Sequence, residues 1–442
     1  MNAGRSGKME LKSNRIALSN GIFLNIVETD KFKSNLLTVN LIRPLEKDEV
    51  TLNALLPMVL ERGSRSFPTK LLLERKLEEL YGASLDLGSS KRGERQIVKA
   101  SIEWADPKFT GDKKSDKEAV NLLKGVLFDP VIVNGSFDDN YISQEKRILI
   151  SRIRSRINDK RNYAISRCIE EMCKGEKFGI YSLGYEEDVE AIDGRKLYEH
   201  YRSILMTSPI EIFFVGNPDG LELEQLLPAE LHNRREILFI PREIIPENYM
   251  SKRQVEEKLS VSQGKLVLGF RSSIPYEHEL YNGLLVGNEL LGGGPNSHMF
   301  KTVREEKSLA YYASSRLIKH KSIILADAGI QFSNYKQVLD LILDQVSRLK
   351  SGDFSDEDLQ IAKKSLENSG RSIVDSNQMI SEFFLGKVIS KDERNLEDML
   401  GDLEKTDRDK VISAMDTVTL DTIYFLNGKE GETDEENLEQ YS

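Results

Sequence analysis

The first half of the chain alternates between strand-like and helix-like stretches of apolar residues. Residues 21–29 and 35–42 are rich in Ile, Val, Leu and Thr, and their partial alternation predicts two strands of a hairpin or meander. Similar stretches predict strands at residues 84–90, 96–105 and 209–217. Apolar residues at helical spacing predict helices from about Thr51, over residues 68–82 and within residues 138–173.

The second half repeats this alternation after a region without a clear period. Residues 226–258 contain three of the 12 prolines and are interpreted as a linker between domains. Strands are predicted at residues 265–272, within 311–332 and at 421–428, and helices at 276–292, at 296–307 and in two further stretches before the last strand. The acidic residues 429–442 are typical of a disordered tail.

The two halves share short words at a constant distance. The word LNALL begins at Leu52 and YNGLL at Tyr281, while LYGAS ends at Ser84 and LAYYAS at Ser314, so the offset is about 230 residues in both cases. A constant offset indicates an internal repeat; chance similarity of two helix-loop-helix segments is the alternative. We therefore expect two similar α/β halves, at residues 1–225 and 259–428, on either side of the linker.

Composition narrows the class of protein. The net charge of −10 argues against a nucleic-acid-binding protein, which needs a concentrated basic face. No apolar stretch approaches the roughly 18 residues of a membrane span, and the start of the chain has no signal-peptide pattern. The two cysteines, Cys168 and Cys173, do not have the spacing of a metal or redox pair, and they indicate reduced thiols. A cytoplasmic location is the simplest expectation.

Residues 290–316, LLGGGPNSHMFKTVREEKSLAYYASSR, resemble the C-terminal half of the insulinase/pitrilysin-type zinc peptidases, the inverzincins. The layout of two halves and a linker is similar to theirs along nearly the whole chain. The resemblance is strongest to the short bacterial type that works as dimers, and in particular to its non-zinc-binding members. It implies an α+β fold in which each half is a mostly antiparallel sheet covered by helices, together forming half of a peptidase clamshell.

The zinc motif of this family, H-x-x-E-H, is degenerate here. In the family, two His on one helical face bind zinc and the Glu between them is the general base. The resemblance matches Ala54, Pro57 and Met58 to these positions and Arg152 to the distal Glu ligand. The positions of the five histidines also exclude a His pair at helical spacing, since none precedes His200 and no two lie within five residues of each other. We expect no metal and no cofactor in this chain.

The same resemblance assigns a role to two residues of the second half. The family supplies an Arg and a Tyr seven residues apart, which here are Arg304 and Tyr311; Tyr312, at a spacing of eight, is a competing assignment. A Tyr hydroxyl can donate to an oxyanion and an Arg can hold a carbonyl. The glycines permit close backbone approach and are predicted to bind substrate: Gly292, Gly293 and Gly294. Residues 322–330 resemble the strands of this family that bind peptide at an edge.

These features favour a half-enzyme, inactive alone, that pairs with a homologous H-x-x-E-H subunit. That partner would carry the zinc, this chain would supply Arg304 and Tyr311, and the substrate would be a peptide, such as a leader segment. The main alternative is a pseudopeptidase that binds peptides or acts as a scaffold. Independent hydrolysis through another metal or a serine nucleophile is disfavoured, because the chain has few histidines and no G-x-S-x-G motif. The basic residues 151–161 fit a solvated helix face, or alternatively a cationic wall for acidic peptides.

Overall fold

The computed structural model describes residues 11–232, 236–245 and 252–429. They form two compact units. The first unit contains the described residues of Met1–Ile153, Ser182–Pro241 and Arg371–Met399, and the second those of Arg154–Tyr181, Arg242–Gly370 and Leu400–Ser442. Each unit therefore includes a segment from the other half of the sequence, which the internal repeat did not predict.

A six-stranded sheet forms the centre of the first unit. Its strands are, in chain order, β1 (Asn14–Ser19), β2 (Ile22–Glu28), β3 (Ser34–Pro44), β4 (Ser84–Arg92), β5 (Arg95–Ala105) and β8 (Ile210–Gly216). Their order across the sheet is β1-β2-β8-β3-β5-β4, and only the β2–β8 pair is parallel. A two-stranded ribbon of β6 (Ile132–Val133) and β7 (Ser136–Phe137) lies outside this sheet.

The predicted hairpin of residues 21–29 and 35–42 is wrong, although both strands exist as β2 and β3. Strand β8 is inserted between them, parallel to β2 and antiparallel to β3. Every residue of β8 is buried, as expected for a mostly apolar strand in the interior of a sheet that is covered on both faces. The hairpin partner of β2 is β1, through a turn in which Gly21 has φ 69°.

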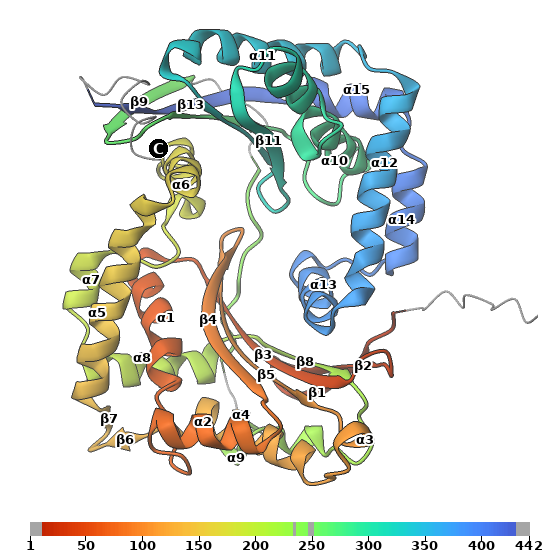
Figure 1. The fold of residues 1–442 in the computed structure, drawn as a ribbon. Coiled ribbons are helices and arrows are strands. Elements are labelled where there is room, and N and C mark those ends of the chain that lie inside the picture. The colour runs from red at the N-terminus through yellow and green to blue at the C-terminus, as the bar shows by residue number, and fades with distance from the viewer. Residues whose placement is uncertain (1–10, 233–235, 246–251, 430–442) are drawn as a thin grey trace, which may run out of the picture. The chain divides into compact units, whose positions relative to one another are not determined.

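Helices cover both faces of this sheet. The first-half helices of this unit are α1 (Lys47–Leu60), α2 (Lys70–Glu79), α3 (Pro107–Thr110), α4 (Ser115–Phe128), α5 (Asp139–Ser155), α7 (Glu186–Glu190), α8 (Gly194–Thr207) and α9 (Ala229–His232), with the 3-10 turn η3 (Leu223–Leu226). The 3-10 turn η7 (Ser372–Asp375) also belongs to this unit. The opposite face from α2 and α4 is covered by α13 (Asn377–Ser390), a helix of the second half (Figure 1). It is followed by α14 (Leu396–Glu404).

The alternation along β3 explains this two-sided cover. Leu37, Val39 and Leu41 belong to the main hydrophobic core under the first-half helices. Thr38 points to the other face and shares a 3.0 Å hydrogen bond with Ser381 of α13. Because side chains alternate across a strand, one strand serves an apolar core and a polar helix contact.

The second unit is built on a five-stranded sheet in the order β11-β12-β10-β13-β9. Its strands are β9 (Arg253–Leu259), β10 (Gly264–Arg271), β11 (Ala310–Ile318), β12 (Ile323–Ile330) and β13 (Thr419–Gly428). All pairs are antiparallel except β13–β9. The expectation for residues 322–330 is wrong, because β12 lies inside the sheet and β11 is its edge.

Helices again lie on both faces. The helices of this unit are α6 (Lys160–Met172), α10 (Tyr281–Asn288), α11 (Tyr335–Lys350), α12 (Asp356–Arg371) and α15 (Arg408–Asp416), with π-helical segments η4 (Glu289–Gly293) and η5 (Phe300–Glu306) and 3-10 turns η1 (Arg156–Asn158), η2 (Lys177–Gly179) and η6 (Phe332–Asn334). Helix α6 comes from the first half of the sequence and packs on β10 and β13, on the opposite face from α11 (Figure 1). A Cβ on Gly269 of β10 would lie 2.6 Å from Met172 Sδ, so this glycine permits the close approach of α6.

The predicted α+β fold of two sheets covered by helices is confirmed. The linker predicted at residues 226–258 stays a prediction, and strand β9, which begins at Arg253, overlaps its C-terminal end. The boundaries at 1–225 and 259–428 stay predictions. Of the predicted tail, residues 430–442 lie outside the described part of the chain. No helix among the described residues is long and apolar enough to cross a membrane.

Candidate functional site

Helix α1 carries the three degenerate positions of the zinc motif. Ala54 is 5% exposed and Met58 is 8% exposed, and both belong to the hydrophobic core of the first unit. Pro57 lies inside the helix, which continues past it to Leu60. All residues from Val50 to Leu60 are buried, so α1 is a core helix and not one with a polar face toward solvent.

The distal ligand position also lacks the required carboxylate. Arg152 lies on α5 with an exposed side chain. Glu145, the acid seven residues before Arg152 on the same helix, is buried and forms an ion pair with Arg62, which follows the C-terminal end of α1. The carboxylate of Glu145 is therefore already neutralised by a cation of the same unit.

These residues do not fit a zinc ion. Zinc sites in proteins are built from Cys, His, Asp and Glu, whereas the matched positions offer a methyl group, a proline ring, a thioether and a guanidinium. Throughout residues 11–232, 236–245 and 252–429, no three His, Cys, Asp or Glu side chains are grouped so that they could hold a metal.

Arg304 lies at the end of η5, in the second unit, with an exposed side chain. Its guanidinium carbon is 4.7 Å from the centre of the Phe300 ring, one helical turn earlier. It forms no ion pair and no hydrogen bond with any residue that the structure describes. A guanidinium that is supported by a ring but keeps its five donors unused can bind an external acceptor.

Tyr311 is the extra residue of a β-bulge at the start of edge strand β11. Ala310 pairs with Ile330 and Tyr312 with Gly329, which leaves Tyr311 unpaired between them. Its side chain is 57% exposed, and its hydroxyl has no hydrogen-bond partner among the described residues. Bulges often redirect a side chain at a functional site, and this one turns a large phenol away from the core.

A tight connection holds the two candidate residues on neighbouring elements. The backbone N–H of Leu309 donates to the carbonyl of Val303 at 2.9 Å, between η5 and β11. Ser308 in this connection has φ 52°, a left-handed conformation that the closed turn imposes. Arg304 and Tyr311 thus flank one short, hydrogen-bonded turn.

Tyr312, the competing assignment, has different surroundings. Its ring lies 4.2 Å from the Arg161 guanidinium and packs over Gly329, where a Cβ would come within 2.4 Å of the ring. Burial raises the pKa of Tyr312 above its usual value. These contacts make Tyr312 a packed residue, and Tyr311 the one that is available to a ligand. The catalytic role of Arg304 and Tyr311 stays a prediction.

The three glycines differ in what surrounds them. Gly292 is buried, and a Cβ there would lie 2.4 Å from the backbone nitrogen of Ser315 in β11. A Cβ on Gly293 or Gly294 would lie nearest the Glu289 carboxylate, at 2.1 and 3.3 Å. Gly292 therefore permits contact with the chain's own strand, and the predicted substrate-binding role of Gly292, Gly293 and Gly294 stays a prediction.

Comparison with known proteins identifies the family. The chain is 34% identical over 423 residues to "Probable inactive metalloprotease YmfF" of Bacillus subtilis, which covers 96% of this chain and 98% of the relative. A family described as "Peptidase M16 inactive domain" matches residues 191–366. The chain belongs to the M16 peptidase family.

Two further relatives bear on the site of this M16 chain. "Uncharacterized zinc protease YmxG", also of Bacillus subtilis, is 22% identical over 305 residues, 66% of this chain and 71% of the relative. The crystal structure of a conserved protein from Enterococcus faecalis V583 superposes with a TM-score of 0.84 at 26% identity, covering 94% of this chain and 99% of the other. The chain is thus a homologue of an inactive M16 metalloprotease and is also related to a protein described as a zinc protease.

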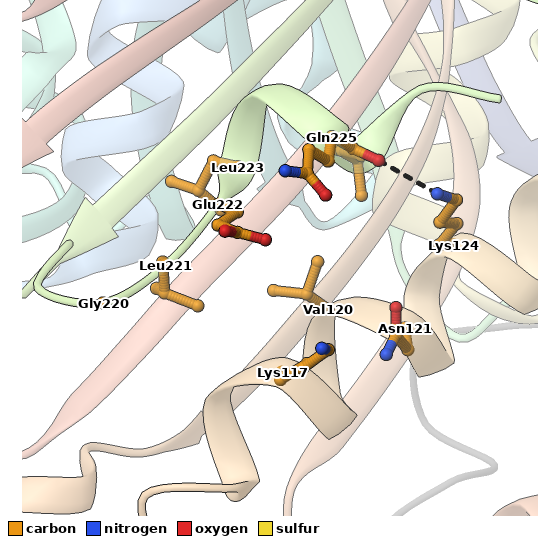
Figure 2. Close-up of a pocket in the computed structure, with 10 residues that line it drawn as sticks. Lys117, Val120, Asn121, Lys124, Gly220, Leu221, Glu222, Leu223 and Gln225 are labelled. Atoms are coloured by element: carbon orange, nitrogen blue, oxygen red, sulfur yellow. Dashed lines mark hydrogen bonds between the residues drawn. The ribbon is translucent and has the colours of Figure 1, made fainter. Parts of the chain in front are cut away.

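The cavities described in the first unit lie elsewhere in this M16 chain. One, of about 330 Å³, lies between α4 and residues 220–226, where Lys124 Nζ donates to the carbonyl of Gln225 at 2.9 Å (Figure 2). Another, of about 890 Å³, lies beside β1 and α13. Neither is lined by the residues predicted for the zinc motif, nor by Arg304 or Tyr311. The candidate site of the second unit is accordingly an exposed turn and strand edge.

Sequence reasoning missed Arg161 as part of this site. It was interpreted as one of several cations on a solvated or chamber-lining helix. In the structure, α6 brings it onto the sheet beside β11, where it contacts Asp327, Ser314 and Tyr312. No local signal in the sequence could have revealed this contact, because its partners are more than 150 positions away.

Proposed function

We propose that this M16 chain is the zinc-less subunit of a heterodimeric metallopeptidase. Its partner would be a homologous subunit with an intact H-x-x-E-H motif, and this chain would supply Arg304 and Tyr311 to the partner's site. The substrate class would be peptides, leader segments of ribosomal peptides among them.

One observation carries this proposal: the contrast between α1 and the turn that follows η5. The first has lost every ligand position to core packing, whereas the second presents a phenol and a guanidinium that have no polar partner among the described residues. A chain that had lost all function would have no reason to keep both groups exposed and unpaired at the spacing of the family motif.

The chemistry of the two groups suits hydrolysis of a peptide bond. During attack on a peptide carbonyl, negative charge develops on the oxygen, and the Tyr311 hydroxyl would donate a hydrogen bond to it. The Arg304 guanidinium would bind a neighbouring carbonyl of the substrate through two of its N–H groups. The partner's zinc would supply the activated water. Loss of one oxyanion donor typically raises the barrier by about 3 kcal/mol, which lowers the rate roughly a hundredfold.

The relatives support a pair of this kind. One bacterium, Bacillus subtilis, has a protein described as a probable inactive metalloprotease and one described as a zinc protease, and this chain is related to both. The first aligns over nearly the full chain and the second over two thirds of it, so the partner we propose is a homologue of the second kind.

A mixing experiment tests the proposal. The chain and an H-x-x-E-H homologue from the same organism would be purified separately, and cleavage of a quenched fluorescent peptide would be followed as one is titrated into the other. We expect neither chain alone to turn over substrate, and activity to rise until the two are equimolar. Full activity of the homologue alone, unchanged when this chain is added, would contradict the proposal and favour the scaffold alternative.

A further inference from the structure

At the start of strand β11, either of two neighbouring tyrosines could project from the strand. In the observed register, Tyr312 pairs with Gly329 and Tyr311 is the bulge residue. If the bulge moved by one position, Tyr311 would lie over Gly329 and Tyr312 would project, while the pairing from Ala313 onward would be unchanged. Because the two side chains are chemically identical, their own preferences cannot decide between these registers. The decision must come from groups that contact the strand.

Three side chains form a closed polar cluster next to the two tyrosines. Arg161 Nε donates to Asp327 Oδ2 at 2.6 Å, and Arg161 Nη2 donates to Ser314 Oγ at 2.6 Å. Ser314 Oγ in turn donates to Asp327 Oδ1 at 2.9 Å. The cluster joins α6, from the first half of the sequence, to β11 and β12.

Burial makes this cluster a fixed anchor. The side chain of Asp327 is 1% exposed, and that of Arg161 is 38% exposed. A buried carboxylate is stable only with a counter-charge and hydrogen bonds, so the Arg161 guanidinium is confined to one place. Two other cations lie farther away: the exposed Arg316 side chain reaches Asp327 only at 3.6 Å, and Lys265 Nζ lies 5.5 Å from the centre of the Tyr312 ring.

The anchored guanidinium lies directly over the ring of Tyr312, 4.2 Å from its centre. On its other side this ring covers Gly329, which has no Cβ and so leaves room for it. On the opposite face of β11, Ser315 Oγ donates to the carbonyl of Asn288 at 3.0 Å. The strand is thus held from both faces just after the bulge, and the ring of Tyr312 fills the space between Arg161 and Gly329.

We propose that Arg161 is a positioning residue: held by Asp327 and Ser314, it keeps Tyr312 over Gly329 and so makes Tyr311 the tyrosine that projects. The consequence for catalysis rests on the proposed function, whereas the choice of tyrosine does not. A cation–π contact between partly buried groups is strong enough to shift an equilibrium between two such registers by up to about tenfold.

The choice of tyrosine can be measured on the chain alone. Tetranitromethane nitrates exposed tyrosines, and fragment-ion mass spectrometry distinguishes modification at 311 from modification at 312. In the wild-type chain we expect nitration of Tyr311 and protection of Tyr312. In Arg161→Ala we expect nitration of Tyr312 to become at least about fivefold faster relative to Tyr311. The matched control is Arg316→Ala, which removes the other cation near Asp327 and should leave the wild-type pattern.

A conservative variant covers the case in which Arg161→Ala does not fold. Arg161→Lys retains the charge toward Asp327 but loses the planar contact with Tyr312 and the second donor to Ser314. We expect it to fold and to show an intermediate nitration pattern. Protection of Tyr312 equal to wild type in both folded variants would overturn the proposal.

Turnover with the zinc-bearing partner separates this inference from the proposed function. We expect Arg161→Ala to lower kcat about twofold with little change in KM, because a tenfold shift from a ratio of about 10:1 leaves about half of the chains with Tyr311 projecting, and to have no further effect when combined with Tyr311→Phe. If Tyr311→Phe alone leaves turnover unchanged, the proposed function fails, whatever the nitration result. If Tyr311→Phe abolishes turnover but Arg161→Ala behaves like Arg316→Ala in both assays, only the role of Arg161 is overturned.

Discussion

Helix α1 has lost the ligands of the zinc motif, whereas the turn between η5 and β11 has kept the Arg and the Tyr of the family motif. On α1, the positions that match the zinc motif now hold Ala54, Pro57 and Met58, all buried. At the turn, Arg304 and Tyr311 are exposed and have no polar partner among the described residues. The comparison teaches that a helix can lose its metal ligands to apolar residues and still pack in the core. A retained site is recognised by exposed polar side chains that have no partner within the described chain.

The largest effect is expected from an attempt to restore the zinc ligands. The double variant Ala54→His with Met58→His would place two imidazoles in the core, and overpacking together with burial of polar nitrogen should lower the free energy of unfolding by about 4 kcal/mol. Urea denaturation measures this, with Leu71→His, at an exposed position of α2, as a nearly neutral control. Unchanged stability with one bound zinc per chain would show that α1 still offers an open site.

Burial of a histidine next to α1 is expected to make the free energy of unfolding depend on pH. His200 Nε2 lies 2.8 Å from Asn53 Oδ1 of α1, and burial lowers the pKa of His200 to about 4. Below pH 6.5 the unfolded chain takes up a proton that the folded chain does not accept until the pH nears 4, so stability is lost as the pH falls through this interval. The loss is up to about 3 kcal/mol. His200→Gln should remove this part of the pH dependence in urea titrations at pH 7, 5.5 and 4; identical slopes would contradict a buried neutral imidazole.

In the second half, the glycines should separate packing from chemistry. Gly292→Ala would bring a methyl group to 2.4 Å from the backbone of Ser315, which cannot move without moving β11, and about 2 kcal/mol of stability should be lost. Gly294→Ala meets only the flexible carboxylate end of Glu289 at 3.3 Å and should change stability by less than about 0.5 kcal/mol. Thermal unfolding of the two variants checks this, and equal losses would contradict the contact between Gly292 and β11.

The smallest effect on stability is expected at Arg304 and Tyr311, the two residues for which we propose the largest effect on peptide hydrolysis. Arg304→Ala and Tyr311→Phe remove groups that have no polar partner in the described chain, so each should change the free energy of unfolding by less than about 0.5 kcal/mol. A loss above about 1.5 kcal/mol in urea denaturation would show that these groups stabilise the fold itself, and it would remove the contrast with α1.

The local patterns of the sequence predicted most elements but not their pairing. Periodicity located β2, β3, α1 and α2, and β8 was predicted as a strand. Its insertion between β2 and β3 depends on contacts across about 170 to 190 positions, which no local pattern encodes. Strand β9 was missed because its alternating polar residues, typical of an exposed edge, resemble a linker.

The site was predictable in its residues but not in its geometry. The spacing of Arg304 and Tyr311 and the absence of a His pair were visible in the sequence. The bulge that separates Tyr311 from Tyr312 was not, because it depends on the pairing of β11 with β12. Arg161 could not be assigned either, since α6 joins a sheet formed by the other half of the chain.

The most direct test of the central claim is the kcat of the reconstituted pair with Tyr311→Phe, measured beside Tyr81→Phe, which alters another exposed tyrosine in the first unit. If this chain lends its phenol to the partner's site, Tyr311→Phe lowers kcat about a hundredfold and Tyr81→Phe leaves it unchanged. Equal kcat values for Tyr311→Phe, Tyr81→Phe and wild type would contradict the account.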